Sequence, residues 1–501
     1  MSLTIQNNSI WAKGFFVLIA TFLAFVFGMI SVTANPIFIG LAVGLVGSIL
    51  LLKSPKKTIW LVIALGLATP ALLDMGGHGL SKILWAVSIM SLMLWLPGLM
   101  NLFDLNKSYS IYNQRSKHVP FFIWLAISFV LFSIISALLE HYSLGEFLTG
   151  FKRYFQAFGL LLVLTTLNIS KQDIDKWLKL LLAIALLQLP FSLFERFVLV
   201  PLRGGISAAG AEATDIVAGT MGANLNGGSP NALMVTFVLI AFSFIFSRWR
   251  VGLISTSKLW LYCIVLLLPL VLGETKIVVF MLPIIGLVLL RKDIVKHPVR
   301  YIPVIIALAG LTVAFAYLYV YVMLGSTFAD AYKISVQYNV KDIGYGTSIL
   351  NRTTVMTFWW KLQSTQDPLG FLFGNGLGSS YGSGMQAGHI AAKYPGYGIS
   401  LTTISTLLWD VGVLGLTLYI TVYAAACRAA SKLWHQTTNS LVKADALAIQ
   451  VALALTLMFT IYSDSQINLI MHEIILAVVF GYLAFLVKQQ HQLEQAELSS
   501  M

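Results

Sequence analysis

Apolar stretches of about 20 residues alternate with short polar segments along nearly the whole chain. A helix of about 20 residues crosses a hydrocarbon core about 30 Å thick, so each stretch predicts a membrane-spanning helix. We therefore expect an all-α polytopic membrane helix bundle, folded as one integral membrane domain over residues 1–501. About fourteen spans are predicted, near residues 14–31, 36–52, 59–74, 83–102, 120–139, 153–168, 177–200, 229–247, 259–273, 277–290, 301–324, 402–426, 446–463 and 471–487.

Composition agrees with this interpretation. The chain is 58% hydrophobic and only 10% charged, and its mean hydropathy is +0.84. A soluble domain carries about 25% charged residues. The composition therefore excludes an ordinary soluble protein.

The positive charges are placed as they are in membrane proteins. The net charge is +12, but there is no basic arm, zinc-ligand spacing or recognition helix, so a nucleic-acid partner is not expected. With the amino terminus in the cytoplasm, the predicted spans put 21 of the 32 Lys and Arg residues inside and 11 outside. Five of those 11 lie in the segment 325–395, which is long enough to escape the positive-inside rule. Both termini are therefore predicted to be cytoplasmic.

Two outer segments are longer than the tight turns elsewhere. Residues 201–228 are rich in Gly and Ala, and residues 325–395 form a loop much longer than usual connections, which is typical of a functional segment. Within the second loop, Thr353–Leu362 predicts a short helix at the membrane surface. Its Trp359 and Trp360 fit either an interfacial aromatic belt or a substrate contact.

Common enzyme signatures are missing from the sequence. The stretch GNGLGSS at 374–380 follows no strand, so it does not indicate a dinucleotide site. Its glycines favour a sharp turn or a close approach of backbone to a ligand. No clustered His, Asp and Glu set with metal-ligand spacing is present, and we expect neither a metal nor another cofactor.

Ionisable residues near the outer ends of the predicted spans are the candidate functional groups. Charged side chains at membrane depth are costly and usually serve a function. Each also has a structural alternative, as an ion pair, an interfacial anchor or a solvated turn residue. The candidates are Lys152, Arg153, Glu195, Arg196, Glu274, Lys276, Arg352, His389, Lys393, Asp410, Asp464, His472 and Glu473.

Several of these residues stand in motifs that resemble a known family. The segment 351–380 carries Arg352, a tryptophan at 359 or 360, Pro368 and glycines at 374, 376 and 378. This order resembles the outer-loop motif of the O-antigen ligase and Wzy-type O-antigen polymerase superfamily. The segments GGSPNALMVTFVLI at 227–240, GETKIVVFMLPIIGLVLL at 273–290 and LLWDVGVLGLTLYI at 407–420 resemble its span entries in the same order.

Two positions depart from the family pattern. Lys276 stands where an arginine is usual, which keeps the charge and loses the two-pronged guanidinium. The His-Asn pair that the family carries about nine residues before its acidic position is absent, because residues 400–403 read SLTT. The second departure argues against the ligase branch.

The resemblance implies a GT-C-like membrane enzyme of the bacterial inner membrane with its active site on the periplasmic side. Its reaction would be metal-independent transfer of a glycan from undecaprenyl diphosphate to an acceptor sugar hydroxyl. Protein partners implied by the family are a flippase and a chain-length regulator. We expect a repeat-unit polymerase, with a glycan ligase as the enzymatic alternative and a lipid-linked glycan flippase or transporter as the alternative of another class.

The candidate residues suit this chemistry. A lipid diphosphate is a good leaving group, so fixed cations that stabilise its charge are the main requirement. We assign this role to Arg352, Lys276, Arg153 and Arg196, with Arg352 best placed for bidentate contact. A general base must take the acceptor proton, for which His389, Asp410 and Glu195 are the candidates.

Overall fold

The chain folds almost entirely into α-helices. The computed structural model describes residues 54–76, 80–103, 119–139, 143–202, 217–223, 230–273, 275–297, 348–382 and 387–500, with scattered positions between 299 and 336. The described residues contain no strand. The predicted all-α class is therefore confirmed. The predicted spans at 14–31 and 36–52, and most of the one at 301–324, lie outside the described residues.

Among the described residues, seven helices are long and apolar enough to cross a membrane, which fits the predicted polytopic membrane protein. They cover Leu84–Leu102, Phe121–Leu139, Lys171–Leu202, Asn231–Arg250, Thr403–Gln436, Ser440–Tyr462 and Ile470–Ser499. Two shorter apolar helices, Thr256–Leu272 and Val278–Arg291, lie at the predicted spans 259–273 and 277–290.

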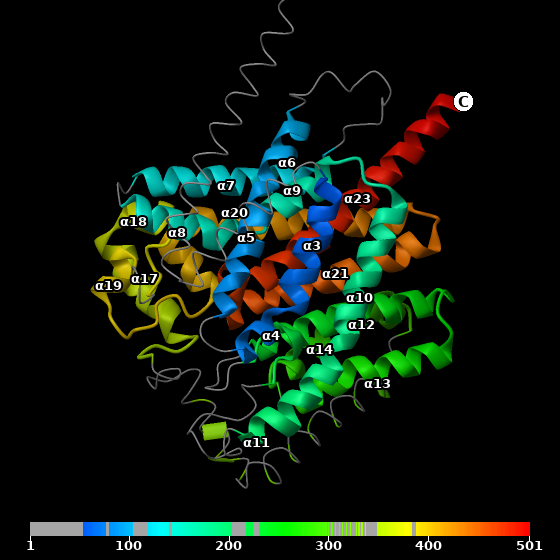
Figure 1. Ribbon diagram of the computed structural model, residues 1–501, viewed down its shortest axis with the longest axis horizontal. Helices are drawn as coiled ribbons and strands as arrows, with labels where there is room; N and C mark the ends of the chain where they lie inside the picture. The colour runs from blue at the N-terminus through cyan, green and yellow to red at the C-terminus, as the bar shows by residue number, and fades with distance from the viewer. Residues whose placement is uncertain are drawn as a thin grey trace, which may run out of the picture.

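The order of helices in Figure 1 is as follows. The first half contains α3 (Pro55–Ala68), α4 (Pro70–Met75), α5 (Leu84–Met93), α6 (Trp95–Leu102), α7 (Phe121–Leu139), α8 (Leu144–Phe155), α9 (Phe158–Thr166), α10 (Lys171–Phe194), a π-helical turn at Glu195–Leu199 and α11 (Val200–Leu202). After a 3-10 turn at Gly219–Met221, the second half contains α12 (Asn231–Arg250), α13 (Thr256–Leu272), α14 (Val278–Lys296), α17 (Thr354–Gln366), α18 (Pro368–Phe373), α19 (His389–Lys393), α20 (Thr403–Gln436), α21 (Ser440–Tyr462), α22 (Ser465–Asn468) and α23 (Ile470–Ser500).

The long helices pack around α21. This helix is apolar on all sides and contacts α12, α14, α20 and α23, which accounts for its nearly complete burial. Helix α23 packs in turn against α9 and α3. The short helices α17, α18 and α19 lie together at one end of the bundle, next to α8 (Figure 1). The predicted short helix at 353–362 is thus present as α17.

The predicted span at 153–168 differs from the structure. The chain forms a broken helix instead, with α8 starting at Leu144 and α9 starting at Phe158. The break lies at Gln156–Ala157, where the Glu473 carboxylate of α23 accepts hydrogen bonds from the Gln156 side chain and the Ala157 N–H. A contact with a residue this far away in sequence satisfies the backbone at the break.

Helix α20 is kinked at Gly412, whose φ of +67° is costly for any residue with a side chain. The kink turns carbonyls of the preceding turn toward other elements, where they find donors. Leu408 O accepts from Trp359 Nε1, Trp409 O from Asn375 N and Asp410 O from Ser136 Oγ. The buried Trp359 is therefore part of the protein core, whereas Trp360 is exposed.

The glycine-rich segment 374–380 packs directly on α8. A Cβ at Gly150 would lie 2.4 Å from the carbonyl carbon of Leu377, and one at Gly378 would lie 2.8 Å from the Glu146 carbonyl oxygen. Only the absence of side chains lets these two backbones meet. The contact holds the loop against the last turns of α8.

Substituting Gly150 with alanine should therefore separate the loop from α8. We expect a lower melting temperature in detergent, because overpacking of this kind costs about 1–3 kcal/mol. Gly286→Ala is the matched control: a Cβ there meets nothing within 4 Å, and alanine should slightly stabilise α14. Equal melting temperatures for the Gly150→Ala variant and the parent would contradict this packing.

Candidate functional site

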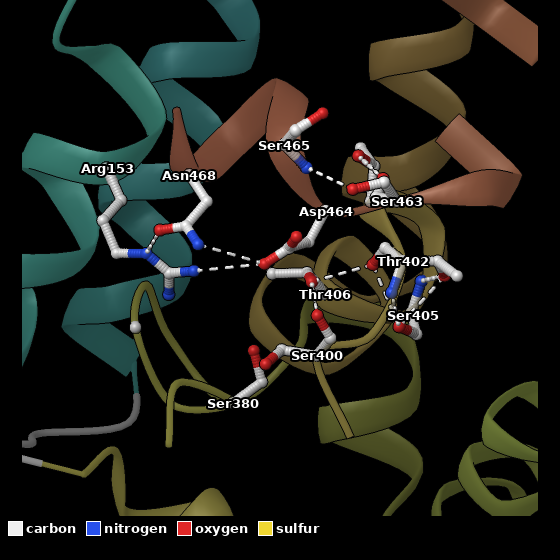
Figure 2. Close-up of polar contacts among 12 residues, drawn as sticks. Arg153, Ser380, Ser400, Thr402, Ser405, Thr406, Ser463, Asp464, Ser465 and Asn468 are labelled. Carbon is white, nitrogen blue, oxygen red and sulfur yellow. Dashed lines mark hydrogen bonds and ion pairs between the residues drawn. The ribbon is translucent and has the colours of Figure 1, made fainter. Parts of the chain in front are cut away.

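A buried arginine lies where α8, α22 and the glycine-rich loop meet. Arg153 is in the last turn of α8 and is only 3% exposed. Its Nε donates to Asn468 Oδ1 at 3.0 Å, and its guanidinium lies 3.5 Å from the centre of the Tyr381 ring. Its Nη2 is 3.9 Å from Asp464 Oδ2, too long for a hydrogen bond. We call Arg153, Tyr381, Asp464 and Asn468 the Arg153 cluster; Figure 2 shows Arg153, Asp464 and Asn468.

Part of the hydrogen-bonding capacity of this cluster is unused within the described protein. Both Nη1 and Nη2 of Arg153 are buried and have no hydrogen-bond partner among the described residues. Figure 2 shows the guanidinium turned toward Asp464 and Asn468. A buried polar group normally finds a partner, and an unpaired charged one is especially costly. The arrangement suits an anion that would accept from these donors.

Asp464 adds a carboxyl group to the Arg153 cluster. Its side chain is 27% exposed and sits between α21 and α23. Burial raises the pKa of its carboxyl above the ordinary value, and the neighbouring Arg153 charge partly opposes that rise.

The loop beside Arg153 is shaped by Asp410. This side chain is fully buried in α20, and its carboxylate accepts four hydrogen bonds. The donors are Ser380 N at 2.9 Å, Ser379 Oγ at 2.8 Å, Gly378 N at 3.2 Å and Tyr154 Oη at 3.0 Å. Gly374, Gly376 and Gly378 all have positive φ, which lets the loop wrap around the carboxylate. The sequence predicted a sharp turn or a close approach to a ligand at these glycines, and the group that the loop approaches in the structure is the Asp410 carboxylate.

Arg352 contacts Tyr462, the last residue of α21. Its Nε donates to Tyr462 O at 2.8 Å, and its guanidinium lies 4.2 Å from the centre of the Tyr462 ring. Tyr462 precedes Asp464 by two residues, so both arginines bind the short connection between α21 and α22. The structure thus brings these two predicted residues to one place.

His389 starts α19 and is tied to α8. Its ring Nδ1 is 2.8 Å from Glu146 Oε1, and its backbone N–H donates to Glu146 Oε2 at 3.3 Å. Both side chains are partly accessible. Since Ile390 N donates to Ser379 O, His389 lies close to the loop that carries Ser380.

Three more of the predicted residues, Glu195, Arg196 and Lys276, lie in the part of the molecule built from α10 to α14. Glu195 is fully buried, and its Oε2 accepts from Ala218 N at 2.9 Å and Gly219 N at 2.7 Å. Arg196 follows it in the π-helical turn, and Lys276 is exposed just before α14. Glu195 therefore anchors residues 217–223, the described part of the predicted loop 201–228.

Several residues of the site were not selected from the sequence. Glu146, Ser380, Tyr381 and Asn468 are partners of predicted residues across long sequence distances. One signal was available for Glu146, because it stands seven residues before Arg153 and a helix brings such residues to one face. Ser380 ends the glycine-rich stretch 374–380, and no comparable sequence signal marks Tyr381 and Asn468.

Neither a metal site in the described residues nor a similar known protein was found. Within the part of the chain that the structure describes, no group of three or more His, Cys, Asp or Glu side chains could hold a metal ion. No protein-family model matches the chain, and no curated protein matches it.

Proposed function

We propose that this protein is a polysaccharide repeat-unit polymerase. It would transfer a glycan from undecaprenyl diphosphate to the hydroxyl of an acceptor sugar at the periplasmic face of a bacterial inner membrane. The observation that carries the proposal is the buried Arg153 guanidinium, with two nitrogens that lack hydrogen-bond partners among the described residues. A diphosphate leaving group offers paired oxygens to such a guanidinium.

The roles follow from what each side chain already binds. Arg153 and Arg352 would hold the diphosphate beside the α21–α22 connection, and Lys276 and Arg196 stay predictions for the same role. Asp410 and Glu195 bind backbone N–H groups with their carboxylates, which favours an architectural role for both. His389 is the candidate that remains as the general base.

A transporter of the lipid-linked glycan is the second candidate. The observation that favours it is the break between α8 and α9 with buried Arg153 and Glu473 beside it, because broken helices near buried charges are common in transporters. The ligase alternative shares the donor chemistry of the polymerase and differs in the acceptor.

Glycan analysis of a deletion strain separates these functions. Loss of a polymerase should leave a single repeat unit on its final carrier. Unattached long polymer would instead indicate a ligase, and lipid-linked units retained on the cytoplasmic face would indicate a transporter. Either of the latter two results would contradict the proposal.

Arg352→Lys tests the second arginine of the diphosphate site. We expect glycan transfer to fall by about 10–10²-fold, and by about 10²–10³-fold for Arg352→Ala, because losing one preorganised donor typically costs up to that much. Lysine keeps the charge but not the planar fork that can bind Tyr462 O and a phosphate together. Lys258→Ala, an exposed change in the first turn of α13, is the control and should stay near the parent rate. Transfer by Arg352→Lys at the parent rate would rule out bidentate binding.

A further inference from the structure

Glu146 and His389 form a pair that resembles the base and its orienting carboxylate in other enzymes. One oxygen of Glu146 lies 2.8 Å from the His389 ring Nδ1, and the other accepts the backbone N–H of the same residue at 3.3 Å. Both carboxylate oxygens are therefore bound by one histidine. The two contacts together fix the position of the His389 ring relative to the Glu146 carboxylate.

The helix α8 connects this pair to Arg153. Glu146, Gly150 and Arg153 are spaced four and three residues apart, so they lie on one face of α8. Gly150 lets the loop with Ser380 pack on that face between the other two. At 1.5 Å per residue, Glu146 and Arg153 are about 10 Å apart along the helix. The proposed base, which would act on the acceptor hydroxyl, and the arginine, which would bind the donor diphosphate, are thus held by the same helix.

We propose that Glu146 is a positioning residue for His389, an inference that rests on the proposed glycosyl transfer. An ionised carboxylate can only accept hydrogen bonds, so Glu146 keeps the histidine proton on Nδ1. Nε2 is then the basic nitrogen. Glu146 thus selects the tautomer in which His389 can take a proton.

The step balances with these groups alone. The acceptor hydroxyl oxygen forms a bond to the anomeric carbon of the donor sugar, and its proton passes to His389 Nε2. The bond from the anomeric carbon to the diphosphate oxygen breaks, and its electron pair stays on the diphosphate beside Arg153. The imidazolium formed is stabilised by Glu146 at 2.8 Å.

The test is a double-mutant cycle on purified protein, with synthetic undecaprenyl-diphosphate-linked glycan as the substrate. Glu146→Gln should reduce transfer by about 10²-fold, because the amide can favour the wrong tautomer, and His389→Ala by about 10²–10⁴-fold. In the His389→Ala background, Glu146→Gln should have no further effect, since its role is exerted through the histidine. Asp367→Asn is the matched control, because Asp367 caps α18 through Gly370 N and asparagine caps equally well.

The outcomes separate this inference from the proposed function. If His389→Ala loses activity while Glu146→Gln stays within about threefold of the parent, the positioning role is wrong and the proposed function stands. If Glu146→Gln lowers transfer equally with and without His389, the glutamate is only structural. If Glu146→Gln fails to fold, Glu146→Asp takes its place, and it should lower transfer in the parent but not in the His389→Ala background. No transfer by the parent protein would remove the proposed function and this inference together.

Discussion

Replacing Arg153 with methionine should abolish glycan transfer, by at least about 10³-fold, without destabilising the protein. Two of the three guanidinium nitrogens have no hydrogen-bond partner among the described residues, so the folded protein bears much of the cost of burying this charge. An apolar side chain of similar length relieves that cost, which offsets the loss of the hydrogen bond to Asn468, the stack on Tyr381 and the charge beside Asp464. We therefore expect an unchanged or higher melting temperature in detergent together with lost activity.

Arg153→Lys sharpens this prediction. Lysine keeps the charge but gives up Nε, which donates to Asn468, and the planar stack on Tyr381. Transfer should fall by about 10²-fold. If Arg153→Met instead lowered the melting temperature strongly and Arg153→Lys restored it, the arginine would be a structural ion-pair partner of Asp464, and the proposed anion site would be wrong.

Asp410→Asn should remove activity by a different route, through loss of structure. The carboxylate accepts hydrogen bonds from two backbone N–H groups of the loop, those of Gly378 and Ser380. In asparagine one of the two oxygens becomes an NH₂ group, which cannot accept, so some of these N–H groups would lose their acceptor. Each buried donor left unpaired costs about 1–3 kcal/mol. We expect a clearly lower melting temperature and transfer reduced by more than about 10²-fold, since the loop carries Tyr381 to Arg153.

Ser379→Ala is the control for this effect. It removes one of the four donors to Asp410 and leaves the backbone contacts in place, so the loss of stability should be much smaller. An Asp410→Asn protein with the parent's melting temperature and no activity would contradict the architectural role and return Asp410 to the list of candidate bases.

The apolar pattern predicted most of the helical framework because membrane spans need long runs of apolar residues. Its main error within the described residues concerns the predicted span at 153–168. The prediction started a span at residue 153, whereas α8 begins at Leu144 and the chain breaks after Phe155, where the Glu473 carboxylate binds Gln156 and Ala157. Such a tertiary contact leaves no local signal in the sequence.

The candidate site was predictable in its residue types and only partly in their roles. Ionisable groups near the outer span ends include Arg153, Arg352 and His389, which the fold gathers around α8 and the α21–α22 connection. The Asp410 carboxylate lies just before the kink at Gly412, and the Glu195 carboxylate binds the turn at 218–219. Neither feature can be predicted from the sequence around these two residues. Motif matching finds acidic residues, but it does not reveal that their oxygens bind backbone.

Reconstitution of the purified protein in liposomes with synthetic undecaprenyl-diphosphate-linked repeat units tests the central claim most directly. In excess chelator, we expect lipid-linked glycans of two or more repeats to form, with one undecaprenyl diphosphate released for each new glycosidic bond. The Arg153→Met protein, at the same density in the liposomes, should form none. Movement of intact lipid-linked units across the bilayer without any new glycosidic bond would contradict the account.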